Sequence, residues 1–429
     1  MISDIKKFKP IKAISIILLL LCILLVTGCT SAPSRGWSGP LVKEGVLYVG
    51  TIEGKVIALD LTSISDGTPD LKWDKDVGAA TGGGGFSCST RVSKPMGVYG
   101  TPVLYEGRLY VGAYNGDILY FNISDGSRSD PFSTDGAIVG DPVVDGDSVF
   151  VASSDGKLYA FDLDLHLKPG WPFKTGDKIW STPVVRNGIV YISSADHKLY
   201  AVDTASGKEI WHFEAEAAIL STPLVVDGTM IYIGACDRKF YALDAATEEE
   251  RLNAVSRQEG SPVPVREAKS VFDGAGNWFW TQALPYNGEI WVGCLDHSVY
   301  ALDAVTLEER ARVTTQGMVY APPVLLGDRI IVGSQDGRVY AIDPETRDWT
   351  AYTIEGDTDS STPDVYVSQD TELLKEAKKP LAPIFAPLYA GSDNDTVYFH
   401  AQDGTHTLYA LALSTEEVVW SFRTDKISE

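Results

Sequence analysis

The sequence predicts an all-β fold, an eight-bladed β-propeller made of four-stranded antiparallel blades. The main observation is one pattern, two short strands around a polar turn, that recurs eight times along the chain. With Gly50 as the marker of the first copy, the others have markers at 112, 152, 193, 234, 293, 333 and 400. The basic spacing is 40 or 41 residues, and three intervals are stretched to 62, 59 and 67. Self-similarity at this period is typical of a repeat architecture.

Each copy reads as a pair of strands, because β-branched or aromatic residues alternate with small or polar ones. The eight copies are residues 47–60, 109–122, 149–162, 190–203, 231–244, 290–303, 330–343 and 397–412.

Two further strands complete each blade. A short apolar segment precedes most copies, and a turn with a Trp-containing strand follows several, as in 204–213 and 412–422. Four strands per 40-odd residues, repeated eight times, predict a propeller, whose radial closure hides the sheet edges. The first blade begins at Pro40 and the last ends near Phe422, so we expect the ring to close by packing of blade faces alone. The preceding segments are 101–104, 141–144, 182–185, 222–225 and 322–325.

The N-terminal residues read as a targeting signal. Four lysines precede an apolar run over 13–26, which is 14 residues long and short for a spanning helix. The run ends in Val-Thr-Gly-Cys, which resembles the lipobox of bacterial lipoproteins, with Cys29 as the lipidated residue. We therefore expect a lipoprotein signal peptide over 1–28, a lipidated tether over 29–38 and a single propeller over 39–429. The protein would be extracytoplasmic and lipid-anchored to a bacterial membrane, either the outer membrane or the membrane at the cell surface. An ordinary secretory signal is the alternative.

Charge and cysteine content exclude some functions. The net charge is −22 for the whole chain and near −25 without residues 1–28, which repels nucleic acid. Besides the anchor, Cys88, Cys236 and Cys294 allow at most one disulfide. A bridge between Cys236 and Cys294 and free thiols are both open.

The three stretched intervals predict insertions near 78–97, 254–277 and 355–384. We expect them in loops that lead from the outer strand of one blade to the inner strand of the next, on the top face. The third insertion contains a predicted short helix over 371–379. Long loops on a rigid scaffold commonly bind ligands, and insertion without function is the alternative.

A recurring aromatic position predicts a binding collar at the mouth of the central channel. It lies about 13 residues before each marker, directly ahead of the inner strand, and is aromatic in six of eight copies. Such a collar suits a flat ring, a sugar or an apolar peptide side chain, whereas packing between blades is the alternative. The positions are Trp37, Tyr99, Val139, Trp180, Leu220, Trp280, Tyr320 and Phe385.

The other polar candidates indicate structure rather than chemistry. A turn aspartate recurs, and we expect each to cap its own turn, with calcium or a cationic partner as the alternative. Cys294, His297 and His197 do not complete a zinc ligand set. We assign no catalytic residue, no metal ligand and no cofactor. The turn aspartates are Asp155, Asp196, Asp237, Asp296, Asp336 and Asp403.

Residues 201–211, Ala-Val-Asp-Thr-Ala-Ser-Gly-Lys-Glu-Ile-Trp, resemble the docking motif of propellers of the pyrroloquinoline-quinone (PQQ) type. The resemblance implies that Trp211 packs onto the neighbouring blade. It also implies the same role for the Trp residues in four less complete copies of this motif. Quinone enzymes of this family would lead us to expect adjacent cysteines, a carboxylate base and calcium ligands. This chain has no adjacent cysteines, although PQQ and calcium are not excluded. The Trp residues of these less complete copies are Trp73, Trp171, Trp349 and Trp420.

The whole chain, with lipobox and eight blades, resembles the BamB-like lipoproteins. This implies a non-catalytic scaffold that holds other envelope proteins. The strong negative charge and the three long loops are departures from that pattern. A surface module for a carbohydrate or small aromatic ligand is the alternative, followed by a PQQ-dependent dehydrogenase.

Overall fold

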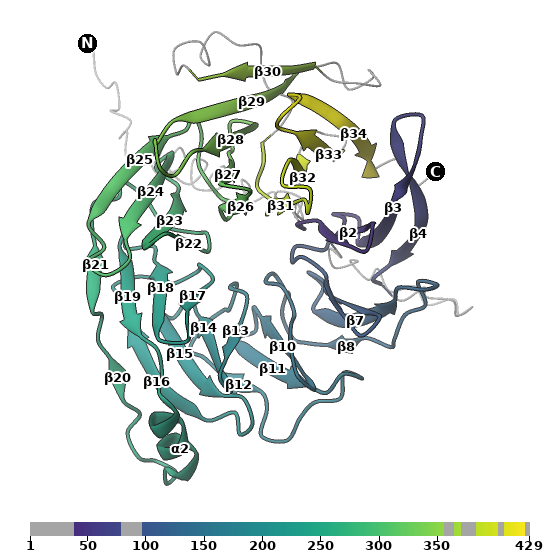
Figure 1. Ribbon diagram of the computed structural model, residues 1–429. Helices are drawn as coiled ribbons and strands as arrows, with labels where there is room; N and C mark the ends of the chain where they lie inside the picture. Colours follow the sequence, from purple (N-terminus) through teal and green to yellow (C-terminus); the bar gives the residue numbers. More distant parts are fainter. Residues whose placement is uncertain (1–37, 79–96, 356–363, 370–382, 402–406, 425–429) are drawn as a thin grey trace, which may run out of the picture. The chain divides into compact units, whose positions relative to one another are not determined.

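The computed structural model describes residues 38–78, 97–355, 364–369, 383–401 and 407–424. Eight β-sheets stand around a central channel, each with its first strand innermost (Figure 1). The predicted fold class is therefore confirmed, an eight-bladed β-propeller of antiparallel four-stranded blades. The residues described lie in one compact unit, Gly36–Glu429.

The first four blades follow one another along the chain. Blade 1 holds β1 (Leu41–Lys43), β2 (Val46–Gly50), β3 (Lys55–Ser65) and β4 (Thr68–Asp76). Blade 2 holds β5 (Val103–Tyr105), β6 (Arg108–Gly112), β7 (Asp117–Asn122) and β8 (Phe132–Ser133). Blade 3 holds β9 (Val143–Asp145), β10 (Ser148–Ser153), β11 (Lys157–Phe161) and β12 (Phe173–Lys174). Blade 4 holds β13 (Val184–Arg186), β14 (Ile189–Ser193), β15 (Lys198–Asp203) and β16 (Glu209–Glu214).

The last four blades repeat this order. Blade 5 holds β17 (Leu224–Val226), β18 (Met230–Gly234), β19 (Phe240–Asp244) and β21 (Ser270–Phe272). Blade 6 holds β22 (Leu284–Tyr286), β23 (Glu289–Cys294), β24 (Ser298–Asp303) and β25 (Glu309–Thr314). Blade 7 holds β26 (Val324–Leu326), β27 (Arg329–Gly333), β28 (Arg338–Ile342) and β29 (Trp349–Glu355). Blade 8 holds β31 (Tyr389–Ala390), β32 (Thr396–Ala401), β33 (Thr407–Ala412) and β34 (Glu417–Arg423).

The apolar core lies between neighbouring blades, and close contact there explains why the marker is so often glycine. A Cβ atom on Gly112 would lie 2.3 Å from the Cγ2 atom of Ile138, which precedes the next blade. On Gly234 it would lie 2.1 Å from the Cβ atom of Phe279. At both positions the missing side chain allows the next blade to pack against the second strand.

Within the described residues the ring closes by packing of blade faces, because the strands of blade 8 and those of blade 1 each come from their own stretch of chain. Trp420 of the last blade joins a buried cluster with Leu47 and Ile57 of the first. The Tyr389 hydroxyl also donates a hydrogen bond to the Val42 carbonyl, at 2.8 Å. The seam between blades 8 and 1 thus depends on side-chain contacts.

The insertion expected at 254–277 lies elsewhere in the fold. We expected it between blades, but its added chain comes between β19 and β21, the third and fourth strands of blade 5. It contains helix α2 (Glu248–Ser256) and strand β20 (Val265–Arg266), which pairs in parallel with β16 as a fifth strand of blade 4. Both lie on the outer rim, away from the channel (Figure 1).

Side-chain contacts fix this insertion to the rim of blade 4. Thr247 and Glu250 form a reciprocal capping box that begins α2. Arg251 donates to the fully buried carboxylate of Asp203, at 2.7 Å. Arg266 lies over the Trp211 ring, 4.8 Å from its centroid. The prediction misplaced the insertion because the fourth strand of blade 5 has no Trp to mark it in the sequence.

The other two insertions are described only in part. The first joins β4 to β5, and residues 79–96 lie outside the described part of the chain. The third contributes β30 (Asp364–Ser368), an antiparallel fifth strand at the outer edge of blade 7 (Figure 1). The helix predicted over 371–379 lies outside the described residues. Within those residues, no helix is long and apolar enough to cross a membrane.

Four of the five predicted docking tryptophans lie in clusters shared with the following blade. Trp211 packs with Ile231 of blade 5, and Trp73 stacks on Phe121 of blade 2 at 6.0 Å between ring centroids. Trp171 likewise joins residues of blade 4, and Trp420 joins those of blade 1.

Trp349 differs from these four. Trp349 pairs across the sheet with Ile342, whereas in blade 4 the equivalent partner, Val202, pairs with Glu209. The Trp349 side chain packs into the cluster between blades 6 and 7. It contacts the preceding blade because neighbouring positions of a strand face opposite sides of the sheet.

Candidate functional site

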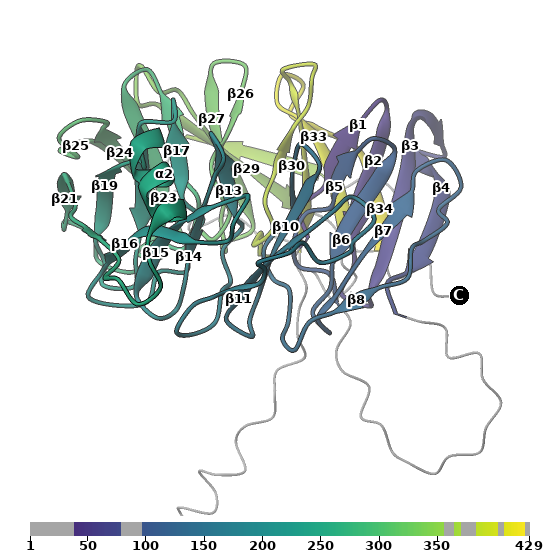
Figure 2. The same cartoon turned by 90° about the horizontal axis from the view of Figure 1, so that it is seen from below.

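The collar positions meet around the central channel, which contains a cavity of about 400 Å³. All seven collar residues within the described part of the chain line it, whereas Trp37 lies outside that part. The view from the side shows the ring that surrounds this channel (Figure 2). The seven are Tyr99, Val139, Trp180, Leu220, Trp280, Tyr320 and Phe385.

The local sequence explains why these side chains reach the channel. Each collar residue directly follows an apolar residue that is almost fully buried, such as Ile179 before Trp180 and Phe279 before Trp280. Successive side chains of an extended chain point in opposite directions, so the collar residue faces away from the blade core. The recurrence in the sequence thus corresponds to a recurrence around the channel, while binding by the collar stays a prediction.

The aromatic rings of the collar lie within contact distance of one another. The Trp180 and Trp280 ring centroids are 6.0 Å apart, with an interplanar angle of 51°. Trp280 and Tyr320 are 6.4 Å apart, and Tyr320 and Phe385 are 5.1 Å apart. Trp180 is 36% exposed, which is unusual for so large an apolar side chain, so part of its surface is free to meet a ligand.

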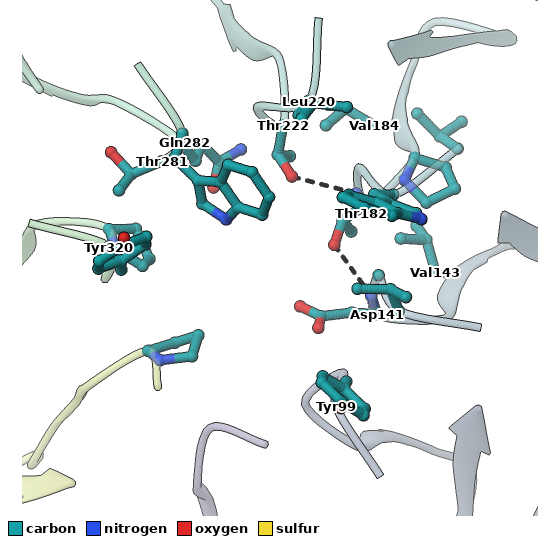
Figure 3. A pocket seen from close by; sticks show the side chains of 18 of the residues that line it. Tyr99, Asp141, Val143, Thr182, Val184, Leu220, Thr222, Thr281, Gln282 and Tyr320 are labelled. Carbon is teal, nitrogen blue, oxygen red and sulfur yellow. Dashed lines mark hydrogen bonds between the residues drawn. The ribbon is translucent and has the colours of Figure 1, made fainter. Parts of the chain in front are cut away.

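Two residues after each collar position comes the residue that leads into the inner strand, and in blades 3 to 8 this residue lines the cavity. Hydrogen bonds connect three of these positions to the next blade. The Thr101 N–H donates to Asp141 Oδ1 at 2.7 Å. The Asp141 N–H donates to Thr182 Oγ1 at 2.9 Å, and the Thr182 N–H donates to Thr222 Oγ1 at 3.1 Å (Figure 3). The remaining positions carry Gly39, Gln282, Pro322 and Pro387.

Asp141 is a carboxylate at a position where three other blades have threonine, and its head points into the open channel (Figure 3). Burial raises the pKa of Asp141 to about 6, and the hydrogen bond from the Thr101 N–H offsets this only in part. Among the described residues, no Lys, Arg or His forms an ion pair with it. Sequence reasoning missed this residue, although its signal is visible as Asp-Pro in place of the repeated Thr-Pro.

The turn aspartates have the structural role that we predicted. In Asp196, one oxygen accepts from the Lys198 N–H at 3.1 Å and the other accepts from the Tyr200 hydroxyl at 2.6 Å. Burial and this carboxylate raise the pKa of Tyr200 well above its usual value. The tyrosine four residues later was not anticipated. Asp155, Asp237, Asp296 and Asp336 make the same pair of contacts, and Asp403 lies outside the described residues.

Cysteine and histidine side chains form no site in the described residues. Cys236 and Cys294 are free thiols, and burial raises the pKa of Cys294 to about 12. His197 and His297 lie exposed at separate turns. No group of three or more metal-binding side chains occurs within the part of the chain that the structure describes.

The channel does not fit the quinone cofactor found in enzymes of related fold. PQQ carries three carboxylates and needs cationic partners in an enclosed site. The described lining instead presents Asp141 next to the collar, and its one cationic residue, Arg186, lies at the other end of the inner strand. We therefore derive no step through that group.

Comparison with known proteins places the fold in a family. The family model described as "Outer membrane protein assembly factor BamB" matches residues 26–164 and 168–275, more than half of the chain. The chain belongs to this family. It is similar to the outer membrane protein assembly factor BamB of Kangiella koreensis, with 27% identity over 128 residues. That match covers 30% of this chain and only 30% of the relative's length.

Solved structures support the fold alone, because their sequence identity is low. The chain is similar to BamB from Moraxella catarrhalis, with a TM-score of 0.59, 14% identity, and coverage of 86% of this chain and 94% of the other. It is also similar to the computationally designed protein Ika8, with a TM-score of 0.63, 15% identity, and coverage of 89% and 98%.

Proposed function

We propose that this protein is a lipid-anchored, non-catalytic scaffold of the bacterial envelope that holds other proteins during outer membrane protein assembly. The observation that carries the proposal is the match to the BamB family over more than half of the chain. The proposal includes cleavage after residue 28 and lipidation of Cys29, since the preceding residues have the order of a lipoprotein signal.

The geometry is suited to such a role. A ring of packed blades is a rigid support, and its channel mouth presents aromatic side chains from separate blades at fixed positions. Aromatic residues are enriched where proteins bind one another, because they bury a large area at low entropic cost. We propose the collar as one contact surface for the partner.

Photo-crosslinking in native cells tests the scaffold role. A photoreactive residue replaces Trp280 or Tyr320, and Val305, which is 70% exposed on the β24–β25 turn of the rim, carries the same group as a matched control. We expect an outer membrane assembly protein to be captured from the collar positions and not from Val305. Capture of the same proteins from all positions, or of none, would contradict the proposal.

The lipid anchor has its own test. Replacement Cys29→Ser removes the thiol that accepts the lipid, so we expect the protein to move from the membrane fraction to the soluble fraction. Metabolic labelling with a fatty acid should be lost in the same variant. Continued labelling of the Cys29→Ser variant would contradict the anchor.

A carbohydrate or small aromatic ligand is the second candidate, favoured by the exposed face of Trp180. A panel of sugars titrated against the purified protein, with tryptophan fluorescence as the readout, distinguishes it from the scaffold role.

A further inference from the structure

We propose that the channel cavity binds an organic cation, an alkylammonium or guanidinium group. The Asp141 carboxylate acts as its counter-ion, and the Trp180 and Trp280 rings form its aromatic walls. The two rings belong to the collar, but binding of a small cation between them does not require the proposed scaffold role.

The first argument is the unbalanced charge of Asp141. One oxygen accepts the Thr101 N–H, and the carboxylate head points into the open channel (Figure 3). The walls of the ring enclose it, and an enclosed carboxylate without a counter-ion is costly unless a cation arrives or a proton is taken up. Within the described residues, no ion pair meets this need.

The charges at the other end of the cavity do not change this conclusion. Arg186 ends the inner strand of blade 4, four residues beyond Thr182, and this corresponds to roughly 13 Å along an extended chain. Its Nη1 atom donates to the Val185 carbonyl at 2.8 Å. Asp145 ends the neighbouring inner strand at the equivalent place, so that end of the lining presents one charge of each sign.

The second argument is the pair of indole rings that line the same cavity. Their centroids are 6.0 Å apart and their planes are inclined by 51°, so a group in the cavity can approach both faces. Cations are attracted to indole faces within about 6 Å of the ring centroid. A carboxylate and two indoles together favour a cation with an apolar surface over a neutral aromatic ring, which would leave Asp141 unpaired.

The donor set also disfavours a metal ion. Calcium takes about six to eight oxygen ligands, and magnesium requires a near-octahedral shell. The described lining offers two carboxylates, Asp141 and Asp145, at opposite ends of one inner strand, and the Thr182 and Thr222 hydroxyls already accept hydrogen bonds from the backbone. The cavity of about 400 Å³ has room for a quaternary ammonium or for the end of a Lys or Arg side chain.

Binding to the purified full chain in detergent tests the site. The probes are choline and 3,3-dimethylbutan-1-ol, which has nearly the same shape without the charge, with calorimetry and tryptophan fluorescence as readouts. We expect saturable binding of choline and at least about tenfold weaker binding of the neutral alcohol. A capped Gly-Lys-Gly tripeptide shows whether a protein side chain is preferred over a free amine.

Two variants assign the binding to this site. In Asp141→Thr the charge is lost but the Thr101 N–H keeps an acceptor, as in the neighbouring blades, and choline affinity should fall at least about tenfold. Trp280→Leu should weaken choline binding as well, whereas Asp145→Asn, at the other end of the channel, should leave it unchanged. Equal binding of choline and the alcohol, no saturable binding of choline or the tripeptide, or full affinity in Asp141→Thr would overturn the inference. If choline does not bind, the scaffold proposal is unaffected, because photo-crosslinking in cells tests the protein partner independently.

Discussion

Replacement Trp420→Ala should destabilise the ring at its seam. The Trp420 side chain is 4% exposed and packs between the last and first blades. A buried tryptophan removes roughly 150–250 Å² from water. At about 25 cal/mol per Å² this burial contributes about 4–6 kcal/mol. Truncations of buried Phe or Trp to Ala generally cost about 3–5 kcal/mol, which is the loss that we expect in the free energy of unfolding.

The position of the effect is more informative than its size. Within the described residues blades 8 and 1 share no strand, whereas Trp211 lies between blades that the chain connects directly. Trp211→Ala is therefore the matched control, with a side chain that is 1% exposed and a similar expected loss. Hydrogen exchange followed by mass spectrometry should show faster exchange in β2, β3 and β33 for Trp420→Ala, and in β15 and β18 for Trp211→Ala.

Chemical denaturation gives the magnitude, and the exchange pattern gives the place. A loss below about 1 kcal/mol for Trp420→Ala would refute the reasoning, because so small a loss is inconsistent with a buried tryptophan. Faster exchange spread evenly around the ring would refute the assignment of the weak point to the seam.

Three further predictions follow from the channel, the blade interfaces and the turns. Asp141→Thr should stabilise the protein by up to about 3 kcal/mol above pH 7. The pKa of Asp141 in the folded protein, about 6, exceeds the usual 3.8, so this carboxyl stabilises the fold less as pH rises through 6. Denaturation midpoints from pH 4 to 8 measure this difference. Gly234→Ala should cost at least about 2 kcal/mol, since its Cβ would lie 2.1 Å from Phe279, as thermal denaturation would show. Tyr241→Phe should cost about 1–2 kcal/mol in chemical denaturation, since Asp237 loses a 2.6 Å hydrogen bond.

Each of these has a control or a contradicting result. A constant difference between Asp141→Thr and the unmodified protein from pH 4 to 8 would argue against titration of Asp141. Tyr99, Tyr320, Asp145 and Arg186 also line the cavity and are the same in both proteins. Ser193→Ala, at the marker position where blade 4 already has a side chain, should cost less than Gly234→Ala. A Tyr241→Phe variant as stable as the unmodified protein would mean that Asp237 is satisfied by its backbone donors alone.

The repeat made the fold predictable from the sequence. Every inner and outer strand that the pattern indicated is present, because each blade repeats the same alternation and the same close approach at the marker position. The collar was also predictable as a set of positions, since a recurring residue ahead of the inner strand must recur in space around the ring.

The remaining features depend on contacts that one repeat does not contain. Helix α2 was not predicted, and its attachment to the rim uses Arg251 and Asp203, which lie far apart in the sequence. Trp349 contacts the preceding blade rather than the following one, which the motif alone did not specify, because its partner across the sheet, Ile342, decides which side it faces. The significance of Asp141 appears only when the channel positions of neighbouring blades are seen together.

The hydrogen bonds along the channel wall also bear on how the ring responds to force. They connect the inner strands of blades 2 to 5, whereas Pro322 and Pro387 lack the N–H needed to extend the series through blades 7 and 8. We therefore expect the arc of blades 2 to 5 to resist opening more strongly than the arc that contains the seam. A pull on the chain ahead of β1 would load that arc first. We expect blades 8 and 1 to separate at the seam while blades 2 to 5 stay joined, so that the channel widens before any of these four blades unfolds.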